Sequence, residues 1–523
     1  MSIPIPNLGW TMSERRSQPA TNIYIGFSLM LVGLLLHYGD SLHLKIFADD
    51  IHSWNIIKSN PDIHWWNLLG KAYFPELYRP LELMLVQLSG GASGPTTEIY
   101  RIVTLTGHFL CGILVWLLAR RLDMTRAVPY AAALLFVFHQ AATMAVLSND
   151  TASQVWSTTL GLAGLLLLFP RDADETVPDR WMPSWSRAIA SAALIFISLL
   201  WKEAGAGFVF IYGVVMMYAV YRSENRRACF ERLLPLLLIF GVYLFLRFNA
   251  GVAVPRIGYS SRYTIWPGVN WLRNPLLMLM ALSTPISTPW IASQYGEGHW
   301  LAFALAGASS IAYVTVAGVG IVLGVRNTPS DRRPLILLAI CLALSMFPEI
   351  LTRRVSELYT YKPNVFYAPL IAYGWVSAYE WMDRQYRKGW IMMVAVALAL
   401  SLHVSSGTHK QIVLAKNGER TEQLMTELHR QVPAIKDPTI VILSDDEADS
   451  FQYSVYQMRP MELFGGPYTI EYIYGVKPIA YRVVSGPTMP DCLAIAGQTG
   501  PVDCLQIRYT DGALKAELAH VGG

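Results

Sequence analysis

The chain has 523 residues, of which 53% are hydrophobic and only 15% are charged. An ordinary soluble protein uses about a quarter of its residues for charge, and a single soluble core stops growing at about 250–300 residues. The 41 basic and 37 acidic residues leave a net charge of +4, a bias too small to indicate a nucleic-acid partner. The composition excludes most soluble proteins and predicts a polytopic membrane protein.

Apolar runs recur along the first 405 residues, each long enough or nearly so to cross a hydrocarbon layer about 30 Å thick. The first, Ile23 to Leu36, has no small-residue cleavage site after it and follows Arg15 and Arg16. We therefore expect a retained helix that enters from the cytoplasm. Further runs bring the expected number of spans to eleven: 99–119, 128–147, 154–169, 188–201, 205–221, 233–250, 299–325, 334–348, 363–380 and 390–404.

Basic residues fall on alternate connections between these runs, which places every cluster on the cytoplasmic side. The clusters are Arg120, Arg121 and Arg126; Arg171, Arg180 and Arg187; Arg222, Arg226, Arg227 and Arg232; Arg326, Arg332 and Arg333; and Arg384, Arg387 and Lys388. The apolar, proline-containing stretch 270–292 is expected to be an interfacial helix or a re-entrant segment on the outer face. A twelfth span there would place the later clusters outside.

An odd number of spans places residues 406–523 outside the cytoplasm, as a second domain after the membrane domain 1–405. Its pattern predicts a small α/β fold: an amphipathic helix at Glu419–Gln431, a buried strand at Thr439–Ser444, and strands near 469–473 and 478–484. Cys492 and Cys504 would lie in an oxidising compartment, so they form a disulfide or remain two buried thiols.

Two adjacent carboxylates stand out in the first outside loop, 40–98. Asp49 and Asp50 directly follow an apolar triplet, and burial at a membrane boundary raises the basicity of a carboxylate. The pair is therefore a candidate general base. Alternatively, Asp50 only caps the following helix. A metal site formed with His52 and His64 is a third interpretation.

Several outside segments carry cations that suit a phosphate. Arg79 lies between Tyr78 and a proline that can begin a helix, and it either binds phosphate or extends to lipid headgroups. Lys202 and Glu203 lie between two apolar runs that almost touch. The two residues are either part of a functional site or a structural ion pair. Cations, carboxylates and aromatic rings together suit a phosphorylated sugar, although aromatic residues also anchor membrane proteins at interfaces. This mixture recurs at Arg256, Tyr259, Arg262 and Tyr263; at Glu297, His299 and Trp300; and at Glu349, Arg353, Arg354, Glu357, Tyr359, Tyr361 and Lys362.

In their order and sidedness these residues resemble the polytopic GT-C glycosyltransferases, and most closely the membrane part of transmembrane-and-tetratricopeptide-repeat O-mannosyltransferases and their bacterial relatives. The matching features are Asp49-Asp50, Tyr78-Arg79-Pro80-Leu81, His108, His139, Lys202-Glu203, and Glu357 with Tyr359, Tyr361 and Pro363. The resemblance covers about residues 23–405. His108, His139 and His403 taken by themselves are typical of core histidines.

The resemblance implies an all-α membrane domain in an inner membrane and an inverting transfer at its outer face. Asp49, favoured slightly over Asp50, would act as base on an acceptor hydroxyl. Polyprenyl phosphate would leave against Arg79, Lys202 and one of Arg256, Arg353 and Arg354. The remaining implied substrate contacts are Tyr78, Glu203, His139, Glu357, Tyr359 and Tyr361. The partners would be a polyprenyl-phosphate-linked sugar, a glycan, lipid or protein acceptor, and membrane lipids; a divalent metal is compatible but not required.

The chain also departs from the family pattern. Gln140 and Met144 stand where proline and glutamate are usual after the histidine, and Leu358 replaces an arginine after Glu357. The last change predicts that phosphate contact in the final loop has moved to Arg353, Arg354 or Lys362. A polysaccharide polymerase or O-antigen ligase is an alternative function. Such a protein does not need an acidic pair early in the chain, whereas this chain has one. A lipid-linked sugar transporter or flippase is a second alternative. Transporters usually hold charged groups at mid-membrane and contain internal repeats, and this sequence shows neither pattern.

Overall fold

A computed structural model of the chain describes residues 20–60, 63–64, 66–74, 77–90, 95–148, 151–169, 182–222, 225–252, 265, 268–352, 355–435, 439–445, 464, 466–485, 502–510 and 513–521. The expectations for Arg256, Arg353, Arg354 and Cys492 lie outside these residues.

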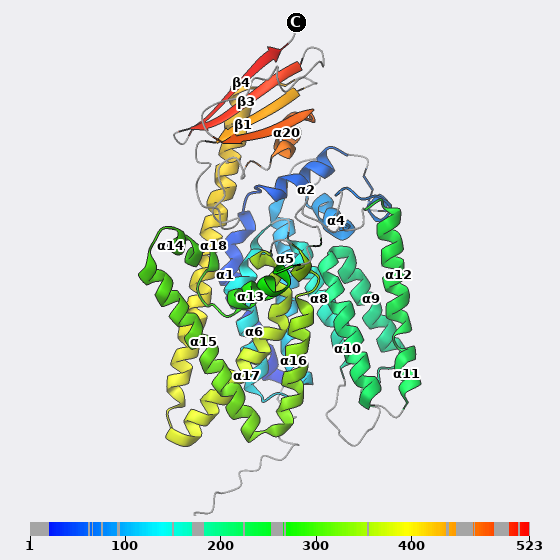
Figure 1. Cartoon of the computed structure of the whole chain (residues 1–523), viewed down its shortest axis with the longest axis vertical. Helices are drawn as coiled ribbons and strands as arrows, with labels where there is room; N and C mark the ends of the chain where they lie inside the picture. The colour runs from blue at the N-terminus through cyan, green and yellow to red at the C-terminus, as the bar shows by residue number, and fades with distance from the viewer. Residues whose placement is uncertain are drawn as a thin grey trace, which may run out of the picture.

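Helices, most of them long, form the body of the molecule (Figure 1). They are α1 Ala20–Tyr38, α5 Thr97–Arg121, α6 Ala127–Phe138, α7 Thr143–Leu147, α8 Ala152–Leu168, α9 Trp185–Trp201, α10 Ala206–Arg222, α12 Leu234–Asn249, α15 Trp300–Asn327, α16 Arg332–Ser345, α17 Tyr361–Tyr386 and α18 Gly389–Gln431. Each predicted apolar run corresponds to one helix, except that the run 128–147 is divided between α6 and α7. This confirms the all-α polytopic class.

Six described helices are long and apolar enough by length and composition to cross a membrane. The pair Ala127–Phe138 and Gln140–Leu147 is bent by 47° and would make a seventh span. The bend occurs where His139 adopts an extended backbone between the two helical pieces. A helix interrupted in this way leaves some backbone N–H and C=O groups without a partner in the helix. Near the bundle interior only other protein groups can form hydrogen bonds with them.

Short helices gather where the long ones end: α2 Asp49–Lys58, α3 Asn67–Gly70, α4 Pro80–Leu88, α11 Arg226–Glu231, α13 Asn270–Leu282 and α14 Thr288–Gly296. The 13 residues of α13 span about 20 Å, too short to cross a bilayer. Its Trp271 and Leu276 are exposed, whereas Asn274 is fully buried and donates to the Thr352 carbonyl at 2.8 Å. An outward apolar face and an inward polar face agree with the interfacial helix expected in 270–292.

The helices approach most closely where small residues meet. A Cβ added to Gly320 of α15 would lie 1.8 Å from the Gly374 carbonyl oxygen of α17, and one added to Gly374 would lie 2.2 Å from the Ala317 carbonyl oxygen. The two backbones are therefore in direct contact, the packing that small residues permit between membrane helices.

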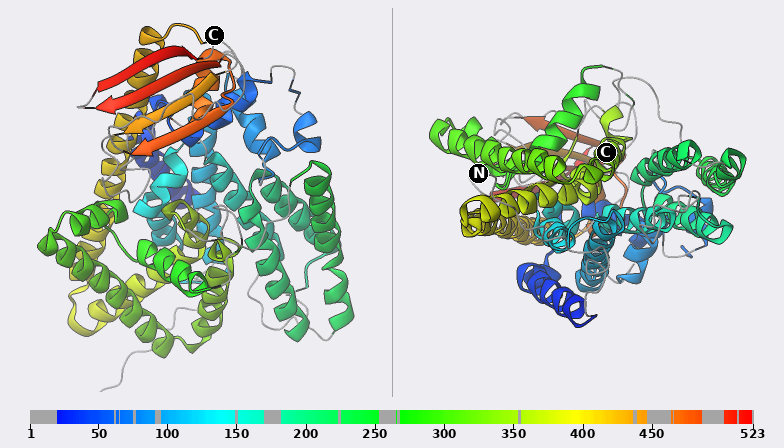
Figure 2. Two further views of the ribbon diagram at one scale, coloured as in Figure 1. Left: turned by 45° about the horizontal axis from the view of Figure 1, so that its top comes forward. Right: turned by 90° about the horizontal axis from the view of Figure 1, so that it is seen from below.

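The C-terminal region forms a four-stranded sheet at one end of the molecule (Figure 2). Its strands are β1 Thr439–Asp445, β2 Ala480–Ser485, β3 Val502–Thr510 and β4 Ala513–Val521, in the order β2-β1-β3-β4. Strand β1 pairs in parallel with β2 and β3, and β3 pairs antiparallel with β4. The central place of β1 explains the continuous apolar run that predicted a buried strand. The strand expected at 478–484 corresponds to β2.

The strand expected near 469–473 was wrong, because these residues belong to helix α20, Pro467–Tyr474. Pro467 stands in the first helical turn, where its missing N–H costs nothing, and Gly475 ends the helix at φ 72°. Both signals are typical of a short capped helix. Leu428 of α18, Leu443 of β1 and Ile470 of α20 share one buried cluster, so the sheet packs on the end of α18.

The 43 residues of α18 run without a break across position 405, over a length of about 65 Å. Its second half contains the predicted helix Glu419–Gln431. A single rigid element therefore links the helical body to the sheet. Cys504 in β3 is disulfide-bonded, whereas Cys111, Cys229 and Cys341 are free thiols.

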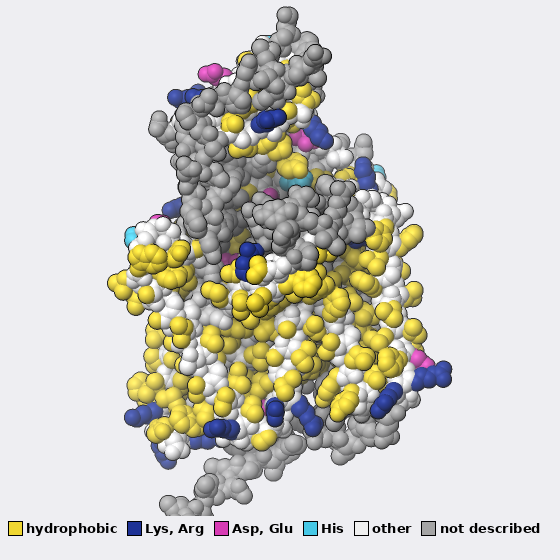
Figure 3. All heavy atoms as spheres, viewed as in Figure 1, with side chains coloured by type: hydrophobic (Ala, Val, Ile, Leu, Met, Phe, Trp, Pro, Cys, Tyr) yellow, Lys and Arg dark blue, Asp and Glu magenta, His cyan; other side chains and the backbone are white. Residues whose placement is uncertain are grey.

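Charge is distributed unevenly along the long axis. Figure 3 shows a wide band of apolar side chains across the visible face of the helical body, with Lys and Arg side chains along the end opposite the sheet. The connections from α5 to α6, from α15 to α16 and from α17 to α18 all lie at that end (Figure 1), and three of the five basic clusters of the sequence fall at these connections. The helices α2 and α4 lie at the other end.

Candidate functional site

Helix α2 begins at the acidic pair, and the two carboxylates have different surroundings. Asp50 is 1% exposed, and its Oδ2 accepts a hydrogen bond from the Phe47 backbone N–H at 3.2 Å. Asp49 is exposed. The preceding residue, Ala48, has φ 50°, a region that costs a non-glycine residue about 1–3 kcal/mol. The structure thus turns Asp50 inward to close the first turn and directs Asp49 toward the surface.

Helix α4 begins beside a cluster of charges. Arg79 precedes Pro80 at the helix start, and its Nε lies 3.2 Å from Oε2 of Glu203. The Tyr78 backbone N–H donates to the other Glu203 oxygen at 2.7 Å. Arg247 of α12 lies 3.6 Å from that same oxygen. Glu203 therefore holds two guanidinium groups and one backbone donor, and the buried Glu82, with its Oε2 3.5 Å from Nη1 of Arg79, is a second carboxylate in the same network.

This cluster changes the predicted pairing of Lys202 with Glu203. Glu203 begins the 3-10 helix Glu203–Gly205 and extends to Arg79 and Arg247, whereas the Lys202 ammonium lies 5.6 Å from the centre of the Tyr359 ring. The adjacent residues therefore contribute to different interactions. Lys202 is 4% exposed, so its charge lies in a protein environment in which electrostatic interactions are stronger than in water.

Lys362 was one of three residues expected to contact phosphate in the last loop, and its surroundings do not favour that role. Its ammonium lies 3.1 Å from Oε2 of Glu349 and donates to the carbonyl oxygens of Ala204 and Phe347, each at 2.7 Å. The residue is fully buried. An ammonium has three donor hydrogens, and here protein oxygens occupy all of them. Lys362 instead fixes the start of α17 to the preceding loop.

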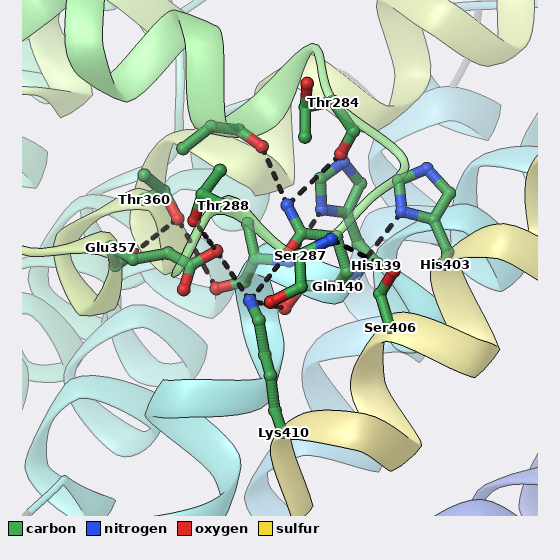
Figure 4. Close-up of polar contacts among 12 residues, drawn as sticks. His139, Gln140, Thr284, Ser287, Thr288, Glu357, Thr360, His403, Ser406 and Lys410 are labelled. Atoms are coloured by element: carbon green, nitrogen blue, oxygen red, sulfur yellow. Dashed lines mark hydrogen bonds and ion pairs between the residues drawn. The ribbon is translucent and has the colours of Figure 1, made fainter. Parts of the chain in front are cut away.

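Glu357 lies in a second buried network (Figure 4). Its Oε1 accepts from the Lys410 ammonium at 2.6 Å and from the Thr288 hydroxyl at 2.8 Å. Lys410 also donates to the Gln140 carbonyl oxygen at 2.9 Å, and the Gln140 backbone N–H donates to Nδ1 of His403 at 3.2 Å. Within the described part of the chain, the second Glu357 oxygen and Nε2 of His403 are buried without a hydrogen-bond partner.

Three of the expected substrate contacts are buried and bonded within the protein. The Tyr78 hydroxyl donates to the Leu69 carbonyl oxygen at 2.8 Å, and burial raises its pKa to about 12. The Tyr361 hydroxyl lies 2.8 Å from Nδ1 of His108. His139 Nε2 lies 3.0 Å from the Leu282 carbonyl oxygen. A substrate could contact these polar atoms only after such bonds break, so His108 and His139 serve as the core histidines that the sequence favoured.

Three side chains near these groups were not among those predicted from the sequence. Arg247 near the end of an apolar helix, Lys410 in α18 and Tyr468 in α20 each contact a predicted residue or its neighbour. A cation beside a long apolar run was the only available signal for the first two. Among the described residues, no group of three or more His, Cys, Asp or Glu side chains could hold a metal ion.

Ile51 and Trp54 of α2 and Leu83 and Val86 of α4 belong to one buried apolar cluster. Packing thus holds the helix that begins with Asp49 beside the helix that begins after Arg79. Both helices lie at the end of the body that faces the sheet (Figure 1).

Comparison with known proteins gives a result for fold only. No protein-family model matches the sequence, and no curated protein matches it significantly. The crystal structure of apo ArnT from Cupriavidus metallidurans is similar at a TM-score of 0.52 and 12% identity, over 94% of this chain and 93% of that one. The oligosaccharyltransferase of Archaeoglobus fulgidus, in a complex with zinc and sulfate, is similar at 0.51 and 14% identity. That match covers 88% of this chain, which spans 62% of the archaeal protein. The chain therefore has a GT-C fold.

Proposed function

We propose that this protein is an inverting glycosyltransferase that moves a sugar from a polyprenyl-phosphate donor to an acceptor hydroxyl at the extracytoplasmic membrane face. The observation that carries the proposal is the exposed Asp49 at the start of α2, a helix packed against the helix α4 that begins after Arg79, in a chain with a GT-C fold. ArnT, whose apo form has this fold, has also been solved bound to undecaprenyl phosphate.

In the proposed reaction Asp49 accepts the proton of the acceptor hydroxyl. The hydroxyl oxygen forms a bond to the anomeric carbon on the side opposite the phosphate, while the bond from that carbon to the phosphate oxygen breaks. The configuration at the anomeric carbon inverts, and polyprenyl phosphate leaves with the bonding electrons. A carboxylate within hydrogen-bond reach of the acceptor suits this general-base role. Asp50, whose carboxylate closes the helix turn, is the weaker candidate.

The leaving phosphate gains negative charge as its bond to the sugar breaks, and positive groups fixed beforehand lower the energy of that state. Arg79 and Lys202 are the described candidates. Glu203 and Glu82 hold the Arg79 guanidinium in place, through Nε at 3.2 Å and Nη1 at 3.5 Å, so its positive charge would be positioned before the phosphate arrives. Arg256, Arg353 and Arg354 remain further candidates from the sequence. Because the described donors do not assemble around a metal ion, no step is assigned to one.

The proposed orientation follows from the distribution of charge. The basic end of the molecule (Figure 3) would face the cytoplasm and the sheet would lie outside, since positive residues are retained on the cytoplasmic side. An inner-membrane protein with a cytoplasmic N-terminus and an extracytoplasmic C-terminal domain accounts for this arrangement.

The test uses the full chain in lipid nanodiscs with undecaprenyl-phosphate sugars that differ in the sugar, together with a membrane extract as acceptor. Release of undecaprenyl phosphate reports turnover. Asp49→Asn should lower turnover by about 10²–10⁴-fold, the usual contribution of a general base, without a change in thermal stability. Glu98→Gln, at another exposed carboxylate of the same end, is the matched control and should retain turnover. Full activity of the Asp49→Asn variant would reject the assignment.

A further inference from the structure

Helix α20 of the C-terminal region lies across α2, the helix that begins with Asp49 (Figure 1). The rings of Tyr468 and His52 are stacked, with their centres 3.6 Å apart and their planes inclined by 14°. Further along the two helices, the Lys58 ammonium donates to the Tyr472 carbonyl oxygen at 2.5 Å and lies 4.5 Å from the centre of its ring. The C-terminal region therefore contacts the first outside loop directly.

The stacked rings are neutral and lie beside two carboxylates. Burial lowers the pKa of the His52 imidazole to about 4, so the ring is uncharged near pH 7. Burial raises the pKa of the Tyr468 hydroxyl, and the nearby negative charges of Glu471 and Asp49 raise it further. Tyr468 is still 37% exposed although His52 covers one face of its ring. The result is an accessible aromatic surface with a carboxylate on each helix.

This combination matches the chemistry of a sugar ring. A pyranose has an apolar face of C–H groups that packs on an aromatic ring, and its hydroxyls donate to carboxylate oxygens. A peptide in extended conformation would instead need unpaired backbone groups at a sheet edge. The backbones of α2 and α20 are helical and satisfy their own hydrogen bonds, so they offer no such edge.

We infer that α20 forms a wall of the acceptor site and that the acceptor is a saccharide, with its ring on Tyr468 and its hydroxyls directed to Glu471 and Asp49. The inference rests on the proposed role of Asp49 as the general base. It assigns to the C-terminal region a part in acceptor recognition, and it assigns to Tyr468 and Glu471 a contact with the acceptor.

Direct binding tests the saccharide site without a donor. The full chain in nanodiscs is titrated with the methyl glycosides of mannose, glucose, galactose and N-acetylglucosamine, and binding is followed by saturation-transfer NMR. At least one glycoside should bind, and Tyr468→Ala should weaken it by about tenfold or more, as expected for an aromatic anchor. Tyr468→Phe and Tyr472→Ala, a matched truncation on the same helix, should bind as the wild type does.

Glu471→Gln keeps the ring stack and should also weaken binding, so the inference remains testable if Tyr468→Ala fails to fold. Equal binding by the wild type, Tyr468→Ala and Glu471→Gln would overturn it, as would a failure of all four glycosides to bind.

Turnover separates this inference from the proposed function. Tyr468→Ala should raise the KM for the acceptor and leave the KM for the donor unchanged. If Asp49→Asn abolishes donor turnover but the Tyr468 variants behave as wild type, the acceptor wall is wrong and the glycosyltransferase stands. If the wild type binds a glycoside through Tyr468 but does not cleave any donor, the function is wrong and the saccharide site stands.

Discussion

The Lys410 ammonium joins three segments that are distant in sequence: α18, the loop at Glu357 and the bend at Gln140 (Figure 4). Removing one partner of a buried ion pair leaves the other charge uncompensated, at a cost of about 3–5 kcal/mol. We expect Lys410→Met to destabilise the protein by this amount in thermal unfolding, and the double variant with Glu357→Met to recover much of the loss.

Lys416, on the same helix and exposed, provides the control: Lys416→Met should unfold as the wild type does. A Lys410→Met protein of unchanged stability would show that the pair does not hold the loop in place.

The buried His52 imidazole makes the free energy of unfolding depend on pH, and the lowered pKa of this group gives the direction. Its pKa is about 4 in the folded protein, against 6.5 for an imidazole in water, so between these values the unfolded chain binds more protons. Stability must therefore fall as pH is lowered from about 6.5 toward 4, by at most about 3 kcal/mol. Thermal unfolding at about pH 7 and pH 5 should show a smaller loss for His52→Gln than for the wild type. Equal losses would exclude His52 as the source.

At the scale of elements, backbone contact between α15 and α17 leaves no room for a side chain. Gly374→Ala would place a methyl group 2.2 Å from the Ala317 carbonyl oxygen, so the helices must move apart. Overpacking of this kind costs about 1–3 kcal/mol. Gly318→Ala on α15 meets nothing within 4 Å and is the control. Thermal unfolding should separate the two variants, and equal stability would show that the helices yield without strain.

At the scale of the whole molecule, α18 determines how the sheet is oriented over the helical body. Lys45 pairs with Glu422 of α18 at 2.8 Å, and Gly418 packs against the Lys45 backbone. One alanine inserted after Ala415 would rotate everything beyond it by about 100°, which would displace both contacts and move α20 away from α2. We expect loss of acceptor transfer with retained donor binding.

An insertion of four residues at the same point returns the helix to within about 40° of its original facing, although about 6 Å further along the axis. It should restore more activity than the single insertion. If both insertions transferred sugar as the wild type does, the position of the C-terminal region would be irrelevant to the reaction.

The sequence by itself determined the helical body, the sidedness of its charges and the buried strand β1. A membrane-spanning helix requires a long apolar run, and basic residues are retained on one side of the bilayer. Both patterns can therefore be recognised in short stretches of the sequence. It also favoured Asp50 over Asp49 as the residue bonded at the helix start, which agrees with the Phe47–Asp50 hydrogen bond, although the helix begins one residue earlier than expected, with Ala48 as its N-cap. The strand expected near 469–473 was wrong because a proline and a glycine at its ends outweighed its apolar pattern.

Only the tertiary structure decided which charges meet. Lys202 and Glu203 are neighbours, yet Glu203 pairs with Arg79 and Arg247 while Lys202 faces Tyr359. Lys410 bonds Gln140 across 270 positions of sequence, and α20 packs on α2 across more than 400. Such contacts depend on how helices pack and which way each side chain points, and neither is encoded in a local pattern.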